Sequence, residues 1–173
     1  MRLIVGLGNP SDEHKSNRHN VGFIFIDKLI KKMDLPLQFD RKFKSEILQT
    51  TNTLYAKPMT FMNSSGLAVA ELVSFYKVNT ENLWVVHDDL DIKLGEFKMQ
   101  KGKGPKDHKG VSSVEDSIGT SDFWRLRIGV DNREADNRIP GEEYVLQNFS
   151  DEEIDVLDEV TEKATNEVIR SIS

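Results

Sequence analysis

The sequence predicts one α/β domain of three layers, in which helices cover both faces of a mixed, mostly parallel twisted sheet. Two observations support this prediction. Short apolar runs, typical of buried strands, alternate with longer segments of helical periodicity. A chain of 173 residues also fits a single domain that buries about 70% of its unfolded surface. No linker or internal repeat divides the sequence, so residues 1–173 are treated as one domain.

The first half of the chain predicts a strand, a helix and a hairpin. The apolar run that starts at Leu3 is broken by Gly6 and Gly8, as expected for a buried strand that ends in a turn. Residues 46–48 and 54–56 alternate around a polar turn and predict a hairpin. Because a hairpin adds antiparallel pairs, the sheet should be mixed. The helix between strand and hairpin is predicted from the spacing of Phe23, Ile26, Ile30 and Met33.

The middle of the chain predicts a capped helix followed by a strand. Asn63 or Ser64 can cap the helix by accepting a hydrogen bond from a free backbone N–H. Residues 83–86 then form an apolar run, which predicts a buried strand that ends at His87 and Asp88. The apolar face of the helix comprises Val69, Leu72, Val73 and Tyr76.

The last third predicts one more strand and a long helix. Residues 124–130 alternate between apolar and other side chains, which is typical of a strand with one apolar face. Ser150 and Glu153 have the spacing of a capping box that opens a helix. The residues predicted to face the core from this helix are Ile154, Leu157, Ala164 and Val168.

Composition excludes several classes of function. Without cysteine the chain has no disulfide, no thiol nucleophile and no thiolate metal site. No run of about 18 apolar residues could cross a membrane, and no charged-then-apolar leader opens the sequence, so a cytoplasmic location without membrane contact is expected.

Charge is distributed unevenly along the chain. The net charge is −6, and eight acidic residues lie between Asp151 and Glu167. A local basic patch is what a phosphate backbone responds to, but lysines also commonly solvate an exposed loop. The chain has one cluster of basic residues, and it leaves both interpretations open. Its members are Lys98, Lys101, Lys103, Lys106 and Lys109, followed by Arg125 and Arg127.

His19 is the leading candidate for a general base, since imidazole titrates near neutral pH. It follows the glycine turn after the first strand, whereas His14, His87 and His108 compete with it as other histidines of the chain. Asp88 follows a second strand, and a carboxylate against the ring would fix its tautomer. The carboxyl ends of such strands share one rim of the sheet, which makes contact between His19 and Asp88 plausible.

Three other kinds of site are disfavoured. Gly6-x-Gly8 lacks the third glycine of a dinucleotide-binding turn, and Pro10 stands where its helix should begin. Residues 87–91 are rich in His and Asp, but neighbours on an extended chain point to opposite faces, and no known metal-ligand spacing accompanies them. A serine elbow of the Gly-x-Ser-x-Gly type is absent. A histidine that activates water, without a covalent intermediate, is the simplest chemistry that is left.

Several segments, in order, resemble the signatures of bacterial-type peptidyl-tRNA hydrolases. Residues 3–10 with 18–22 resemble the first signature, 57–66 the second and 86–91 the third. Residues 123–129 and the pair of segments 144–146 and 149–150 resemble later family segments. The resemblance implies a cytoplasmic, monomeric enzyme of translation and ribosome rescue. It would bind tRNA and, without cofactor or metal, hydrolyse the ester between a peptide and the terminal ribose of tRNA.

The resemblance also implies roles for individual residues. His19 would be the base that activates water, Asp88 would hold it in its basic form, and Asn9 would distinguish peptidyl from free aminoacyl substrates. Asn63 would bind the peptide backbone, with Phe61 and Met62 lining the cleft. Lys98 and Arg127 would contact tRNA phosphates.

Two positions depart from the family pattern. His14 stands beside the cleft where the family usually has Tyr, and an imidazole offers less stacking surface. Residues 104–110 correspond to a glycine-rich loop of the family. His108 is kept in this loop, but Lys109 replaces Asn, and an ammonium can only donate hydrogen bonds. A non-hydrolytic RNA-binding relative, similar to organellar splicing factors of this fold, is therefore the alternative to an active hydrolase.

Overall fold

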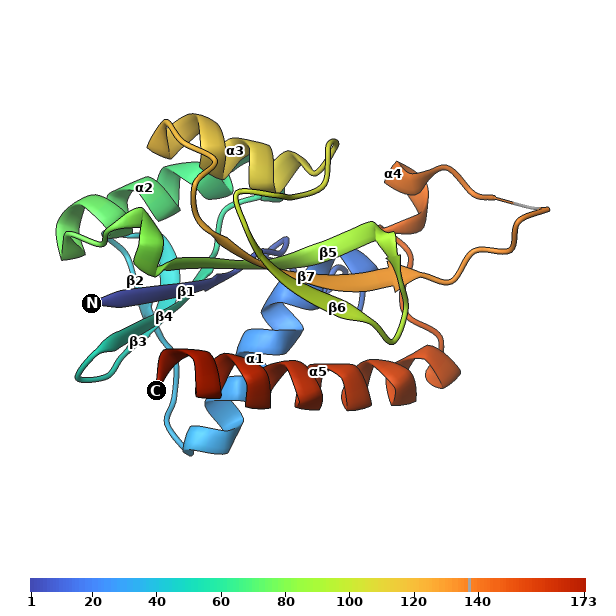
Figure 1. Ribbon diagram of the computed structural model, residues 1–173, viewed down its shortest axis with the longest axis horizontal. Helices are drawn as coiled ribbons and strands as arrows, with labels where there is room; N and C mark the ends of the chain where they lie inside the picture. The colour runs from blue at the N-terminus through green and yellow to red at the C-terminus, as the bar shows by residue number, and fades with distance from the viewer. Residues whose placement is uncertain (137) are drawn as a thin grey trace.

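The computed structural model describes residues 1–136 and 138–173 and is built on a seven-stranded sheet of order β2-β3-β4-β1-β5-β7-β6 (Figure 1). The strands are β1 (Arg2–Gly6), β2 (Gln38–Asp40), β3 (Ser45–Gln49), β4 (Thr53–Pro58), β5 (Leu83–Lys93), β6 (Phe97–Lys101) and β7 (Trp124–Asp131). The helices are α1 (Val21–Met33), α2 (Ser65–Tyr76), α3 (Lys109–Ile118), α4 (Gly141–Tyr144) and α5 (Asp151–Ile172). Short 3₁₀ turns are η1 (Arg18–Asn20), η2 (Met62–Ser64) and η3 (Thr80–Asn82).

The sheet is mixed, as the sequence predicts. The central strands β4, β1, β5 and β7 run parallel to one another. The predicted hairpin is the antiparallel pair β3–β4, and β2 and β6 add antiparallel edges. Neither edge strand is predicted from the sequence. β2 is only three residues long, and the alternation of Phe97 and Met99 with Lys98 and Gln100, which is typical of a strand, was missed in β6.

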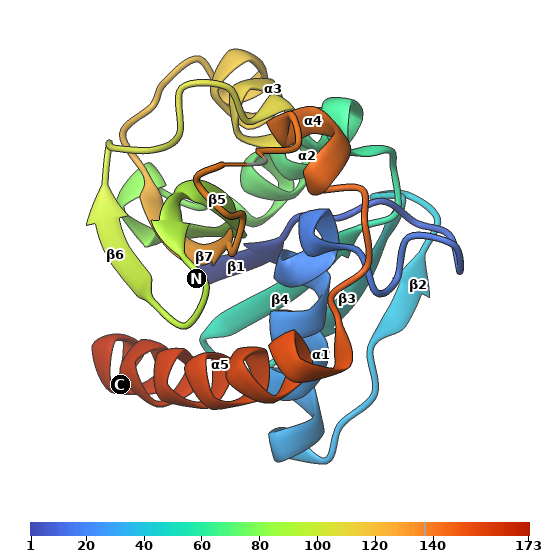
Figure 2. The same cartoon turned by 90° about the vertical axis from the view of Figure 1, so that its right-hand side faces the viewer.

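Helices cover both faces of the sheet, which confirms the three-layer prediction. Figures 1 and 2 show α1 and α5 on one face and α2 and α3 on the other. Successive strand residues point to opposite faces, so neighbours on β1 enter different cores. Ile4 packs with α1 and α5, whereas Leu3 and Val5 pack in the cluster that includes α2 and α3.

The structure corrects two details of the predicted helices. Ile154 on α5 is 39% exposed, whereas the other residues predicted to face the core from this helix are buried. Ser64 occupies the N-cap of α2, but neither it nor Asn63 makes a side-chain capping hydrogen bond. By contrast, the capping box of Ser150 and Glu153 is present at the start of α5.

The glycines of the first turn serve packing between β1 and α1. A Cβ at Gly6 would lie 2.2 Å from the carbonyl oxygen of Gly22, and one at Gly8 would lie 2.6 Å from the ring of Phe23. These glycines let strand and helix approach closely, which explains the motif without a phosphate cradle.

Among the described residues, no helix is long and apolar enough to cross a membrane.

Candidate active site

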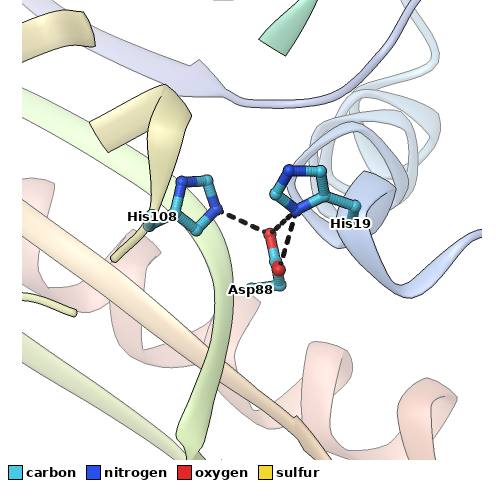
Figure 3. Close-up of side chains that lie close together, drawn as sticks. All are labelled: His19, Asp88 and His108. Carbon is cyan, nitrogen blue, oxygen red and sulfur yellow. Dashed lines mark hydrogen bonds and ion pairs between the residues drawn. The ribbon is translucent and has the colours of Figure 1, made fainter. Parts of the chain in front are cut away.

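The site is built where β5 extends beyond its neighbour β1. The pairing of β1 with β5 ends at Gly6 and Val86, while β5 continues and stays paired with β7 past Asp88 to Asp89. Asp88 therefore lies inside the strand, and the prediction that the strand ends there is wrong. The physical reason is that β7 supplies hydrogen-bond partners which the local sequence does not reveal. Beyond the end of β1, the turn η1 approaches this part of β5 (Figure 3).

His19 lies in η1 and contacts Asp88 directly. Its Nδ1 is 2.9 Å from Oδ2 and 3.0 Å from Oδ1 of Asp88. Since an ionised carboxylate only accepts hydrogen bonds, the ring proton is assigned to Nδ1. Nε2 then carries the lone pair and makes no hydrogen bond to any described residue, so it is the atom able to act as a base.

His108 contacts the same carboxylate from the other side (Figure 3). Its Nε2 lies 2.8 Å from Asp88 Oδ1, while its Nδ1 accepts hydrogen bonds from the backbone N–H groups of Gly110 and Val111. His108 is thus the N-cap of α3, and this use of Nδ1 assigns its proton to Nε2. The carboxylate receives a hydrogen bond from each histidine, so neither ring is free to rotate without losing one.

Electrostatics follow from this geometry. Burial lowers the pKa of His19, but the charge and hydrogen bond of Asp88 outweigh burial and raise that pKa above its usual 6.5; the charge of Lys109 opposes the rise. Burial raises the pKa of Asp88, yet His19 and His108 outweigh it and hold that pKa well below its usual value. Asp88 therefore stays ionised and gives His19 a charged partner at neutral pH.

His87 is a buried histidine beside this pair. Its Nδ1 lies 2.8 Å from the backbone carbonyl oxygen of Asp88, and its ring packs edge-on against His108. Burial and the neighbouring His108 lower the pKa of His87 to about 3. It is therefore neutral at physiological pH and belongs to the wall of the site.

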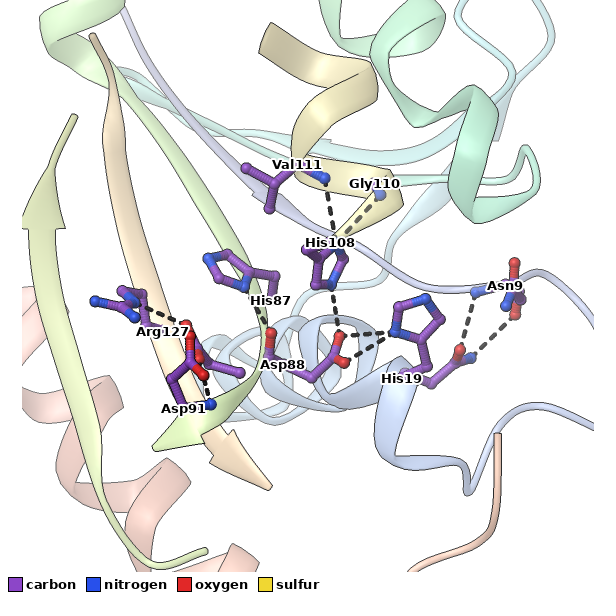
Figure 4. A network of polar contacts seen from close by, with 11 residues as sticks. Asn9, His19, His87, Asp88, Asp91, His108, Gly110, Val111 and Arg127 are labelled. Carbon is purple, nitrogen blue, oxygen red and sulfur yellow. Dashed lines mark hydrogen bonds and ion pairs between the residues drawn. The ribbon is translucent and has the colours of Figure 1, made fainter. Parts of the chain in front are cut away.

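Asn9 is fixed in the turn next to the base (Figure 4). The side chain of Asn20 bonds both the N–H and the carbonyl oxygen of Asn9, at 2.9 and 3.0 Å. Asn9 Oδ1 accepts from the N–H of Met62 at 2.8 Å, which identifies the oxygen of this amide. Its Nδ2 makes no hydrogen bond within the described residues and so is available as a donor.

The other predicted cleft residues are placed differently from one another. Phe61 is 63% exposed and Asn63 is exposed on η2, whereas Met62 is only 4% exposed. The sulfur of Met62 lies under Gly110, so Met62 supports the start of α3. His14 lies in the loop before η1 and hydrogen-bonds Ser11, and it makes no hydrogen bond to His19, Asp88 or His108.

The basic segment is partly paired and partly free. Lys98 on β6 is exposed opposite Arg127 on β7, and Lys109 is exposed at the first residue of α3. Arg127 donates to Asp89 at 2.7 Å and also to Gln100. Arg125 is 1% exposed and paired with Glu115, so its inclusion in the surface patch is wrong: β7 turns this side chain inward beneath the glycine-rich loop.

The donor set fits a hydrogen-bonded triad better than a metal centre. His19, Asp88 and His108 offer ligand atoms within 4.8 Å of one another. However, a metal at Nε2 of His108 would require a lone pair there, while Nδ1 already uses its own lone pair to cap α3. A neutral imidazole has only one such lone pair.

Sequence reasoning missed two supporting residues beside the base. Asn20 holds the turn of Asn9, and Arg18 is buried against Glu153. Both flank His19 in sequence, which was the available signal. Their partners lie on the first turn and on α5, and only the fold shows those contacts.

Comparison with known proteins identifies the family. A family model described as Peptidyl-tRNA hydrolase matches residues 3–173. The peptidyl-tRNA hydrolase of Bdellovibrio bacteriovorus is 40% identical over 172 residues, which cover 97% of this chain and 91% of that protein. The peptidyl-tRNA hydrolase of Mycoplasma mycoides is 38% identical over 164 residues, covering 91% and 85% of the two chains.

Solved structures agree with these relatives. The crystal structure of peptidyl-tRNA hydrolase from Acinetobacter baumannii superposes with a TM-score of 0.86 at 32% identity, covering 97% of this chain and 86% of that one. The chain therefore belongs to the peptidyl-tRNA hydrolase family.

Proposed function

We propose that this enzyme hydrolyses the ester between a peptide and the terminal ribose of tRNA, with His19 as the base. The observation that carries the assignment is the contact of His19 Nδ1 with the buried Asp88 carboxylate, which leaves Nε2 as the acceptor. Membership of the family supports peptidyl-tRNA as the substrate. The intact base and its charged partner favour hydrolysis over a purely RNA-binding role.

The reaction requires no covalent intermediate on the protein. Nε2 of His19 takes a proton from water as the water oxygen attacks the ester carbonyl carbon. Asp88 stabilises the imidazolium that forms. When the bond to the ribose oxygen breaks, the imidazolium returns its proton to that oxygen, which releases a free peptide and a tRNA with a free hydroxyl group.

Asn9 is proposed to read the first peptide group of the substrate. Because Oδ1 is occupied by the N–H of Met62, the free Nδ2 donor would face a peptide carbonyl oxygen. Free aminoacyl-tRNA has no such carbonyl and would leave the donor unpaired, which is how a polar site rejects an analogue. Asn63 on η2 and Phe61, the residue before η2, are both exposed and would extend this contact along the peptide.

The tRNA would lie across the exposed lysines of β6 and the start of α3. Lys98 and Lys109 are proposed to meet phosphates directly, since both are exposed. Arg127 lies opposite Lys98 and is paired with Asp89. It is proposed to contribute to phosphate binding from this position beside Lys98. His14 and His108 stay candidates for the cleft wall. We propose a monomer that works without metal in the cytoplasm, where translation supplies its substrate.

Purified protein should release N-acetylated amino acid from N-acetyl-aminoacyl-tRNA and leave unblocked aminoacyl-tRNA almost untouched. The assay should be run with and without a chelator, because the proposed chemistry uses no metal. Binding of tRNA without release of product would identify the protein as the non-hydrolytic relative instead. Loss of activity on chelation would contradict the metal-free mechanism.

A further inference from the structure

The turn that carries the proposed base is attached to the last third of the chain. The backbone N–H of His19 donates to the carbonyl oxygen of Val145 at 2.8 Å, and that of Arg18 donates to Gln147 at 3.1 Å. The α1 helix begins immediately after this turn, but η1 itself has no side-chain cap. The position of His19 therefore depends on where the segment 144–149 lies.

The side chain of Arg18 reinforces this attachment from inside the protein. Its Nη2 donates to Glu153 Oε1 at 2.6 Å, with side-chain exposures of only 8% and 5%. Its Nη1 reaches the carbonyl oxygens of Tyr144 and Gln147, and the guanidinium lies 4.0 Å from the centre of the Tyr144 ring. One side chain thus spans from η1 to both α4 and α5.

Glu153 is held just as firmly on its own side. It is the third residue of α5, and its Oε1 also accepts from the backbone N–H of Ser150 at 2.9 Å as part of the capping box. Its Oε2 lies 3.4 Å from the side-chain nitrogen of Asn132 at the end of β7. The carboxylate is therefore a junction between the start of α5, the end of β7 and the turn of His19.

We propose that the buried Arg18–Glu153 pair is a positioning device that holds the His19 imidazole in register with Asp88. The proposal rests on the proposed function of His19 as the base. His19 directly follows Arg18 in the short turn η1, and α1 begins two residues later. A shift of Arg18 therefore moves the His19 imidazole with it. A displacement of about 1 Å at a reacting group can cost roughly 10²-fold in rate.

A role limited to stability is the competing explanation. Buried ion pairs are weak evidence for stability, because desolvation offsets much of their attraction, while removal of one partner is costly. A variant could therefore lose activity simply because fewer molecules are folded. The two explanations differ in the pH dependence of kcat, since unfolding reduces the number of active molecules without changing how the remaining ones titrate.

Glu153→Ala removes the junction, and Glu153→Gln keeps an oxygen that can still accept from Arg18 and Ser150. We expect Glu153→Ala to lower kcat by roughly 10- to 10²-fold with little change in KM, and Glu153→Gln to recover most of that loss. The groups that face His19 are Asp88, His108 and Lys109. A looser contact with Asp88 should lower the pKa of His19, so the acid limb of the kcat profile should move to lower pH.

Glu115→Ala is the matched control. It removes the carboxylate that pairs with another buried arginine, Arg125, which lies on the face of the sheet opposite to the Arg18–Glu153 pair. We expect it to lower the melting temperature while leaving the acid limb in place. If Glu153→Ala fails to fold, the double variant Arg18→Met/Glu153→Leu replaces the pair with apolar groups, a change that buried pairs often tolerate. The same lower kcat and shifted limb are expected from it.

The pKa of His19 can be measured by NMR without any assay of activity. This measurement keeps the test of the positioning role separate from the test of the proposed function. The shift in His19 pKa is expected in the variants whether or not the protein hydrolyses peptidyl-tRNA, whereas inactivity of the unmodified protein would overturn only the proposed function. A wild-type His19 titration and a wild-type acid limb in folded Glu153→Ala or in the double variant would overturn the positioning role. So would equal losses of kcat in Glu153→Ala and Glu115→Ala.

Discussion

The site around Asp88 and the lysine segment of β6 and α3 lie close together in the fold but are built on opposite principles. In the region around Asp88, His19 and His108 each use one ring nitrogen to hydrogen-bond the carboxylate, and Asp88 is only 3% exposed. In the second, Lys98 and Lys109 are exposed and form no ion pair within the part of the chain that the structure describes. The first region is fixed by its own hydrogen bonds, while the second presents charge to solvent.

This difference indicates a division of labour. A base needs a defined tautomer and a defined place, which buried hydrogen bonds supply. A polyanion is attracted by unpaired charges over a distance and needs no single geometry. Changes in the buried region should therefore affect kcat on every substrate. A change at Lys98 should affect KM only on substrates that carry distant phosphates, whereas Lys109 also acts on His19 through its charge.

The largest effect is expected from His19→Ala. Removal of a general base costs roughly 10²–10⁴-fold in rate, and the exposed lysines remain to bind tRNA. Turnover of N-acetyl-aminoacyl-tRNA should therefore nearly vanish while tRNA affinity, measured by filter binding, stays close to wild type. Near-normal turnover would rule out His19 as the base.

Asp88→Asn should reduce kcat less completely than loss of the base. The imidazole survives, but its charged partner is gone, and an amide can present N–H to Nδ1 and favour the wrong tautomer. Because Asp88 raises the pKa of His19, its removal lowers that pKa and moves the acid limb of the activity profile to lower pH. An unchanged pH profile would show that Asp88 does not tune His19.

Asn9→Ala should alter selectivity more than rate. Without the Nδ2 donor, the ratio of kcat/KM for blocked over unblocked aminoacyl-tRNA should fall by roughly tenfold, the value of about 1.4 kcal/mol for one lost hydrogen bond. Both substrates are assayed in parallel. Equal slowing of the two would assign Asn9 to support of the Met62 turn and not to recognition.

Lys98→Gln should weaken binding of full-length tRNA and flatten its salt dependence. Loss of one phosphate contact reduces the slope of log affinity against log salt by about 0.7 to 0.9. A minimal substrate ending in the terminal adenosine should be unaffected. Lys163→Gln, an exposed lysine on α5, is the matched control and should change neither substrate. Equal losses on both substrates would place Lys98 in the cleft.

The smallest effect is expected from Lys109→Asn, which lies at the border of the two regions. The charge of Lys109 lowers the pKa of His19, so its removal raises that pKa and moves the acid limb of the profile to higher pH. Full-length and minimal substrates should show the same displacement, because it originates in His19. A displacement seen only with full-length tRNA would make Lys109 a phosphate contact alone.

The sequence by itself determined the parts of the fold that depend on local patterns. Alternating apolar runs and helical periodicity predicted the layers, and the hairpin predicted a mixed sheet. The capping box at Ser150 and Glu153 was also readable, because its residues are three apart and need no other element. The position of His19 just after the first strand was likewise predicted, because it depends only on residues that are close in sequence.

Tertiary structure decided which of these residues meet. Asp88 lies within β5 because β7 pairs beyond the end of β1, and His108 reaches it only because α3 begins there. The inward turn of Arg125 and the contact of Arg18 with Glu153, 135 residues away, depend on strand register and helix docking. Periodicity and capping are properties of neighbours in sequence, whereas contacts over such separations are fixed only when the cores on both faces of the sheet pack.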